Sequence, residues 1–210
     1  MLQEPGRSAR VSSNKGRVPA SVERHVGVLL ALPADASAAA VGGVLAGMAM
    51  EKNNLGVYLN DHLAEAAAAL ELLNGMRDVD GLAAFADGLR PSIEEDRAQL
   101  LSLMTAASVP VNGMKSAAAW LSEKFAEIKV RVDDRRAGPL RRLELLEALS
   151  LGIEGKRALW SALETAASED ASLAVLDYGE LITRAAQQRD EVEHLRLEAA
   201  VHALGSTPDA

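Results

Sequence analysis

Residues 170–204 have the sequence DASLAVLDYGELITRAAQQRDEVEHLRLEAAVHAL and form the last long segment before the C-terminal tail. Apolar side chains recur in this segment at alternating spacings of three and four residues: Ala174, Tyr178, Leu181, Ala185, Val192, Leu195 and Ala199. This spacing puts them on one face of a helix, and such a face packs against other helices. The segment therefore predicts one helix of a bundle, and the rest of the chain is expected to supply its partners.

Composition supports a single all-helical domain. The chain has 210 residues, which is enough for one full-sized domain and too few to require two. Hydrophobic residues make up 49% of the chain and aromatic residues only 3%, so burial depends on many Ala and Leu side chains. Such a composition favours closely packed helices over a sheet, which would contain more Val, Ile, Tyr and Phe.

Charge and cysteine content argue against several classes of function. The formal net charge of -8 and the pI near 5.1 disfavour a nucleic-acid-binding protein, because phosphate backbones require a concentrated cationic surface. The lack of cysteine excludes disulfides, thiolate catalysis and cysteine-ligated metals, and it is compatible with a reducing compartment. We therefore expect no nucleic-acid partner and a cytoplasmic location.

The N-terminal part of the sequence differs in character from the rest. Its apolar runs, residues 26–32 and 36–50, are each shorter than the roughly 20 residues of a membrane-spanning helix, and a break containing Asp35 separates them. An export signal is the less favoured alternative, because its apolar run would be minimal and its leading polar segment long. We expect residues 1–50 to be a poorly ordered or loosely attached extension of a bundle domain over residues 51–210, without a membrane span.

Capping and breaking residues divide the bundle domain into helices. Asn53 or Asn54 can cap the first helix. Pro91 interrupts the second helical region, where Ser92 and Glu95 form a capping box for a new or kinked helix. The expected helical segments are residues 55–73, 80–107 with the interruption at Pro91, 114–132, 140–167 and 170–204.

Three short motifs lie on these predicted helices. They are YLNDHL at residues 58–63, EDR at residues 95–97 followed by two leucines, and GIEGK at residues 152–156 followed by Leu159 and Trp160. Together they resemble uncharacterised bacterial proteins of the ferritin-like superfamily, over residues 51–205. The resemblance implies an up-down four-helix bundle in two antiparallel pairs, with a long crossover between the second and third core helices. It also implies that residues 1–49 are an extension, or that Met50 is the natural initiator.

Residues 114–132 fit the crossover that the resemblance implies. Their apolar pattern marks an amphipathic helix: Met114, Ala117, Leu121, Phe125, Ile128 and Val132. The second and third core helices of this superfamily run parallel, so the chain has to return along the bundle between them. A helix over residues 114–132 would span roughly 30 Å, which is enough for that return. The predicted fold is therefore an all-α, ferritin-like bundle with a helical crossover.

The metal-ligand pattern of the superfamily is incomplete in this sequence. Ferritin-like di-iron proteins need one Glu on each of two helices and a Glu-x-x-His pair on each of the other two, all projecting inward. Only Glu191 and His194 have that spacing here, and a helical wheel puts His194 roughly 140° from the core face, toward water. Glu95 has Ala98 where its histidine would be needed. We expect a degenerate metal site and no resident cofactor.

An alternative interpretation keeps a metal ion. Glu65 and Glu147 lie toward the edges of their apolar stripes, and together with His62 and Glu95 they are candidates for an unorthodox ligand set. An iron or manganese site of this kind would make the chain a di-iron or di-manganese oxidoreductase, or an iron-handling protein.

Three polar residues fall inside the apolar stripes, namely His62, Lys156 and Gln188. Buried polar groups need partners, and a lysine in a bundle core either pairs with a carboxylate or loses its charge. These residues can surround a small ligand site. In the structural alternative, Lys156 snorkels to the surface while His62 and Gln188 make ordinary interhelical hydrogen bonds.

No motif for nucleophilic catalysis is present, because the sequence contains no Gly-x-Ser-x-Gly and its four histidines lack a partner pattern. We therefore expect a non-enzymatic, ferritin-like bundle of unknown biochemical role, with no catalytic residue assigned. The alternatives are the metal-dependent protein and a small-molecule or partner-binding bundle. A homodimer is left open, and no protein partner can be named.

Overall fold

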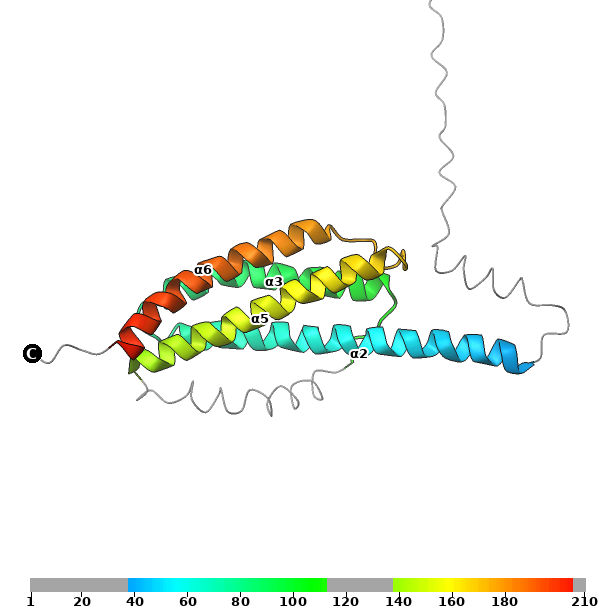
Figure 1. Cartoon of the computed structure of the whole chain (residues 1–210), viewed down its shortest axis with the longest axis horizontal. Helices are drawn as coiled ribbons and strands as arrows, with labels where there is room; N and C mark the ends of the chain where they lie inside the picture. Colours follow the sequence, from blue (N-terminus) through cyan, green and yellow to red (C-terminus); the bar gives the residue numbers. More distant parts are fainter. Residues whose placement is uncertain (1–37, 113–137, 206–210) are drawn as a thin grey trace, which may run out of the picture.

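The computed structural model describes residues 38–112 and 138–205, and these residues form four helices and no strand (Figure 1). The helices are α2 (Ala38–Met76), α3 (Ala83–Ala106), α5 (Gly138–Ala167) and α6 (Tyr178–Leu204). They pack side by side along one common axis, with α5 lying closest to α6 and with α2 against both α3 and α5. The prediction of an all-α bundle is confirmed.

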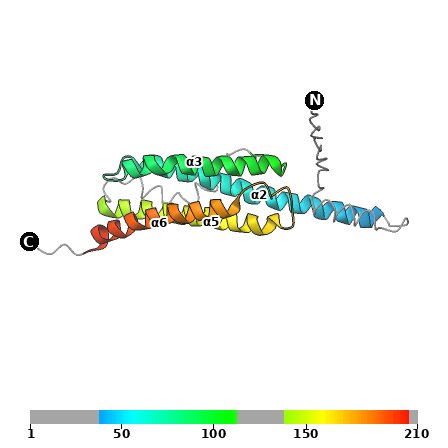
Figure 2. The same cartoon turned by 90° about the horizontal axis from the view of Figure 1, so that it is seen from above.

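The direction of the helices defines the topology. Figures 1 and 2 show that α2 and α3 are antiparallel, as are α5 and α6, and that α3 and α5 run in the same direction. The end of α3 and the start of α5 therefore lie at opposite ends of the bundle. The helix predicted over residues 114–132 lies outside the described residues, as does most of the predicted N-terminal extension.

The apolar core consists of two clusters, one toward each end of the bundle. The first cluster includes Leu73, Met76, Leu82, Ala86, Leu89, Ile93, Leu143, Leu145, Leu146, Leu149, Ile153, Ala185, Val192 and Ala199. The second includes Leu59, Leu63, Leu100, Leu103, Met104, Ala107, Val109, Leu159, Trp160, Leu163, Leu173, Tyr178 and Leu181. Along α3 the boundary between the clusters falls between Ile93 and Leu100, and along α5 it falls between Ile153 and Leu159. Polar side chains occupy this boundary.

Several predicted helix boundaries differ from those of the structure. Helix α2 passes through Asn53 and Asn54 without a break, so neither residue is a cap, and residue 50 lies within this helix. Its N-terminal part projects beyond the other helices (Figures 1 and 2). The glycines in this part lower helix propensity without terminating the helix.

Helix α3 is continuous through Pro91, where the start of a new helix was one of the two expectations. It contains Pro91, and the Ser92 hydroxyl donates to the Leu89 carbonyl oxygen at 2.8 Å instead of capping a new helix. The proline ring removes one backbone donor. Leu89 and Ile93 on either side of it are buried in the same apolar cluster, and their burial favours a continuous helix.

The segment that indicated the fold forms a helix over a shorter range than predicted. Helix α6 begins at Tyr178, and the Asp177 side chain accepts a hydrogen bond from the Glu180 backbone amide at 3.0 Å. This is a standard N-cap contact, which satisfies an amide that has no partner within the helix. Ala174 therefore precedes the helix instead of lying on its apolar face. Helix α5, by contrast, begins and ends close to the predicted limits of residues 140–167.

None of the described helices is both long enough and apolar enough to cross a membrane.

Candidate functional site

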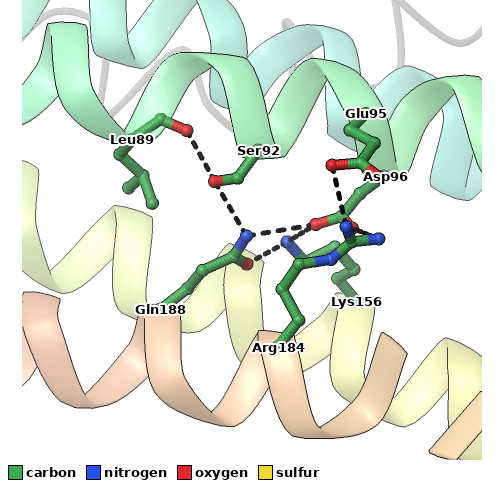
Figure 3. Close-up of polar contacts among 7 residues, drawn as sticks. All are labelled: Leu89, Ser92, Glu95, Asp96, Lys156, Arg184 and Gln188. Atoms are coloured by element: carbon green, nitrogen blue, oxygen red, sulfur yellow. Dashed lines mark hydrogen bonds and ion pairs between the residues drawn. The ribbon is translucent and has the colours of Figure 1, made fainter. Parts of the chain in front are cut away.

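A layer of polar side chains separates the two apolar clusters. We call it the polar layer, and it consists of Ser92, Glu95 and Asp96 from α3, Lys156 from α5, and Arg184 and Gln188 from α6 (Figure 3). Asp96 is only 3% exposed and Gln188 only 4%. A charged group buried to this extent is costly unless it is paired and hydrogen-bonded.

Lys156 lies at the centre of the polar layer. Its ammonium group donates to one oxygen of the Asp96 carboxylate and to the side-chain oxygen of Gln188 (Figure 3). The side chain is 15% exposed, so it does not extend into solvent as the snorkelling interpretation expected. Burial lowers the pKa of Lys156 below its ordinary value of 10.5, and the Asp96 carboxylate partly opposes this effect.

Gln188 links the layer across the bundle. Its amide nitrogen donates to the Ser92 hydroxyl at 3.0 Å and to Asp96 Oδ2 at 3.3 Å. Because its oxygen accepts from Lys156, both ends of the amide have partners. A fully satisfied buried amide holds its neighbours in one arrangement, since any shift of α6 against α3 would leave a buried polar group unpaired.

Arg184 connects α6 to α3 at the edge of the polar layer. Its guanidinium forms ion pairs with Asp96 Oδ1 at 2.8 Å and with Glu95 Oε2 at 2.9 Å. Asp96 thus has two cationic partners, Lys156 and Arg184, on its two oxygens. The carboxylate that is most buried in the layer is therefore already neutralised by the chain itself.

A small pocket adjoins the polar layer between α2, α3 and α5. Its volume is about 40 Å³, and its lining residues are His62, Glu65, Ala66, Ala69, Ile93, Asp96, Arg97, Leu100, Gly152, Ile153, Lys156, Leu159 and Trp160. A cavity needs roughly 10–15 Å³ to hold one water molecule, so this pocket has room for a few water-sized groups. The walls are mainly apolar and include a few polar side chains.

His62 and Glu65 form the α2 side of this pocket. His62 Nδ1 lies 2.8 Å from Glu65 Oε2, and the Tyr58 ring meets the imidazole edge-on with ring centroids 4.7 Å apart. Burial and the nearby Glu65 carboxylate raise the pKa of the Tyr58 phenol. Glu65 therefore already has a partner in His62, and Tyr58 packs against that imidazole.

Two buried donors on the pocket residues have no acceptor. Arg97 Nε and Trp160 Nε1 lack a hydrogen-bond partner among the residues that the structure describes. Trp160 is only 1% exposed, so water outside the bundle cannot satisfy its indole N–H. A buried donor without an acceptor costs roughly 1–3 kcal/mol, which a bound water or ligand would recover.

The four candidate metal ligands do not converge. His62 and Glu65 line the pocket, whereas Glu95 is exposed and paired with Arg184, and Glu147 is exposed and lies 3.5 Å from Arg196. Across residues 38–112 and 138–205, no group of three or more His, Asp or Glu side chains is arranged to hold a metal ion. His194 of the Glu-x-x-His pair is exposed, in agreement with the helical wheel, and lies 3.3 Å from Glu198.

The structure brings together the residues selected as buried polar candidates and adds others. Lys156 and Gln188 are in direct contact, and His62 shares the pocket lining with Lys156. Asp96 was missed, although it occupies a core position of the stripe that also contains Ile93 and Leu100. Comparison of the chain with family models, curated proteins and solved structures finds no match. The functional argument therefore depends on this geometry.

Proposed function

We propose that this chain is a non-enzymatic helical bundle with a ferritin-like architecture, in which the polar layer occupies the part of the core where ferritin-like proteins bind metal. In that superfamily the metal site is built from side chains that project inward from facing helices. Here an internal ammonium group takes the position of the metal cation. The protein would then work by binding and not by metal-dependent catalysis.

The observation that carries this proposal is the position of Lys156. Its ammonium group is hydrogen-bonded to Asp96 and Gln188 within the core. A divalent metal ion would have to displace this cation and compete with Arg184, which lies 2.8 Å from the same carboxylate. Since Fe²⁺ and Mn²⁺ need carboxylate and imidazole ligands with free lone pairs, a carboxylate engaged by two cations is a poor ligand.

The ferritin-like assignment has its own support. The parallel direction of α3 and α5 is the arrangement that the superfamily requires of its second and third core helices (Figures 1 and 2). The polar layer also crosses the middle of the bundle, between the two apolar clusters. These features favour a ferritin-like bundle over a simple up-down bundle with short connections.

The metal-dependent alternative is less well supported by the geometry. Only His62 and Glu65 of its four candidates lie together, and they already pair with each other at 2.8 Å. Glu95 and Glu147 are exposed and form ion pairs with arginines. Two adjacent ligands do not complete the coordination that iron or manganese requires.

The experiment that tests the proposal is a measurement of metal content. Untagged protein, expressed with iron and manganese supplied and purified without chelator, would be analysed by plasma mass spectrometry. We expect less than about a tenth of a metal ion per chain, because no complete ligand set is present. About two metal ions per chain, lost in a Glu65→Ala/Glu95→Ala variant, would contradict the proposal and establish the metal-dependent alternative.

A second candidate function is the binding of a small molecule, and the two unsatisfied donors of the pocket favour it. A ligand with an acceptor group would satisfy Arg97 and Trp160 at once. If the pocket binds a small molecule, the polar layer would form one rigid wall of the site, since Asp96 and Lys156 belong both to the layer and to the pocket lining.

A further inference from the structure

We propose that the pocket between α2, α3 and α5 binds the carboxylate group of a short-chain monocarboxylic acid, with Arg97 and Trp160 as donors to the carboxylate. This inference rests on the second candidate function, because it names the class of ligand. It does not depend on whether the fold is ferritin-like.

The hydrogen-bonding argument begins with Trp160. Its indole N–H is a donor only, lies in a residue that is 1% exposed, and has no acceptor among the described residues. Arg97 Nε is a second buried donor that has no acceptor among the described residues. Both residues line the same pocket of about 40 Å³. A single ligand that accepts from both donors needs more than one lone pair, and a carboxylate supplies this.

The charges around the pocket favour an anion over a neutral acceptor. Both carboxylates in the lining have a basic partner: Glu65 lies against His62, and Asp96 forms ion pairs with Lys156 and, through an oxygen that accepts no hydrogen bond within the described residues, with Arg184. The Arg97 guanidinium, in contrast, takes part in none of the ion pairs found within the described part of the chain. An anionic ligand would give this cation a partner, and charge-assisted hydrogen bonds are roughly twice as strong as neutral ones.

The size and the walls of the pocket define the rest of the ligand. Apart from its polar groups the lining is apolar, and it includes Ala66, Ala69, Ile93, Leu100, Ile153 and Leu159. A volume of about 40 Å³ has room for only a few heavy atoms. The walls would desolvate a second carboxylate without pairing it, so a dicarboxylate is disfavoured. The ligand is therefore a monocarboxylate of about two to four carbon atoms, with propionate as a representative.

The test is a titration of the full-length chain with propionate, using propionamide as the neutral compound of matched shape. Fluorescence reports binding at Trp160 if the second tryptophan, Trp120, is replaced by Phe. Isothermal calorimetry on the unmodified chain gives an independent value. We expect propionate to bind at least about tenfold more tightly than propionamide, because only the carboxylate gains from the charge of Arg97.

Variants identify the donors. Arg97→Gln should weaken propionate binding about tenfold, and Trp160→Phe, which keeps an aromatic ring but removes the donor, about fivefold. Arg77→Gln is the matched control, because Arg77 is a surface residue paired with Asp87 at 3.0 Å. It should change the affinity less than about twofold. Circular dichroism would verify that each variant is folded, and Arg97→Gln, which is only partly buried, tests the proposal even if Trp160→Phe does not fold.

Three outcomes would overturn the inference. These are no saturable signal with propionate, equal affinity for propionate and propionamide, and unchanged affinity in folded Arg97→Gln protein. The first would mean that only water satisfies the two donors, and the second would mean that the site takes a neutral acceptor. The metal measurement is made on separate protein without carboxylate present, so failure of this inference and failure of the proposed bundle function are distinguishable.

Discussion

At the scale of single residues, Lys156 determines the electrostatics of the polar layer. Its ammonium group is buried, which lowers its pKa, and it remains in the core because Asp96 and Gln188 both accept hydrogen bonds from it. Buried ion pairs of this kind add little net stability compared with apolar residues of similar volume. Removing one member is costly, however, because the groups that remain are buried without partners.

We predict that Lys156→Met lowers the free energy of unfolding by about 1–3 kcal/mol at neutral pH. The loss is moderate because Asp96 keeps its ion pair with Arg184 at 2.8 Å, while the Gln188 oxygen loses the hydrogen bond from Lys156. Urea denaturation monitored by circular dichroism measures the difference. Arg157→Met on the same helix is the control, since Arg157 pairs with Glu154 at the surface, and it should have little effect. A Lys156→Met variant as stable as the wild type would show that the layer does not depend on its central cation.

The polar layer was partly predictable from the sequence. Lys156 and Gln188 stood out because each interrupts an apolar stripe, and the structure buries Gln188 and most of the Lys156 side chain. Asp96 also interrupts an apolar stripe, on α3, but it follows Glu94 and Glu95 and therefore resembles part of an exposed acidic run. Which residues pair across the bundle was not predictable, because that depends on the relative height of three helices that are distant in the sequence.

At the scale of the helices, contacts of Tyr178 and Asp177 determine where α6 begins. Tyr178 is buried, and its hydroxyl donates to the backbone carbonyl oxygen of Leu173 in the preceding turn. Asp177 caps the same end. Burial raises the pKa of Tyr178 from 10.0 to about 12. This contact connects the stability of the helix start to the protonation of one phenol.

We predict a loss of stability at alkaline pH that depends on Tyr178. Because its pKa is raised in the folded state, the phenol binds its proton more tightly there than in the unfolded chain. The resulting stabilisation is fully present below about pH 10 and is lost as the pH rises toward about 12. Thermal unfolding of wild type and Tyr178→Phe, measured at intervals over this range, would follow the loss.

The phenylalanine variant serves as the reference in this experiment, because it keeps the ring but has no titrating group. Other residues, including the lysines, titrate over the same range in both proteins. The melting temperature of the wild type should therefore fall relative to that of Tyr178→Phe as the pH rises. Parallel pH profiles would contradict the assigned cause.

Helix content was predicted better than helix boundaries, and the reasons are local. The 3.6-residue apolar pattern identified α5 and α6 and correctly placed them in a bundle. The expected helix start at Asn53 or Asn54 and the expected interruption at Pro91 came from residues that favour caps and breaks in isolation. At Pro91 the burial of Leu89 and Ile93 favours a continuous helix. Asn53 and Asn54 are exposed within α2, and the preference of an asparagine for a cap position is worth only about 1 kcal/mol.

At the scale of the whole molecule, the polar layer divides the core into two apolar halves. Replacing its buried members together, as Ser92→Ala, Asp96→Leu, Lys156→Met and Gln188→Leu, would join the two halves into one core. We predict that this variant is more stable by about 1–4 kcal/mol, because apolar packing replaces costly buried charges. Arg184 keeps its pairing with Glu95, which lies at the surface.

The same variant should be less uniquely packed than the wild type. The hydrogen bonds from Gln188 to Ser92 and Asp96 fix the height of α6 against α3, and apolar contacts do not restrict that height to one value. We expect broadened signals in a two-dimensional amide NMR spectrum together with the raised unfolding free energy. A variant that is less stable than the wild type would contradict the view that the layer stabilises one arrangement at the expense of overall stability.

The four helices lie nearly along one axis, and this has a consequence for how the molecule orients in solution. Helix α2 alone, with 39 residues, is about 58 Å long. Amide N–H bonds in a helix point along its axis, so most of the helical N–H vectors share one line with the long dimension of the particle. In a dilute liquid crystal the chain should align strongly, and the residual dipolar couplings of all four helices should cluster near one extreme of their range.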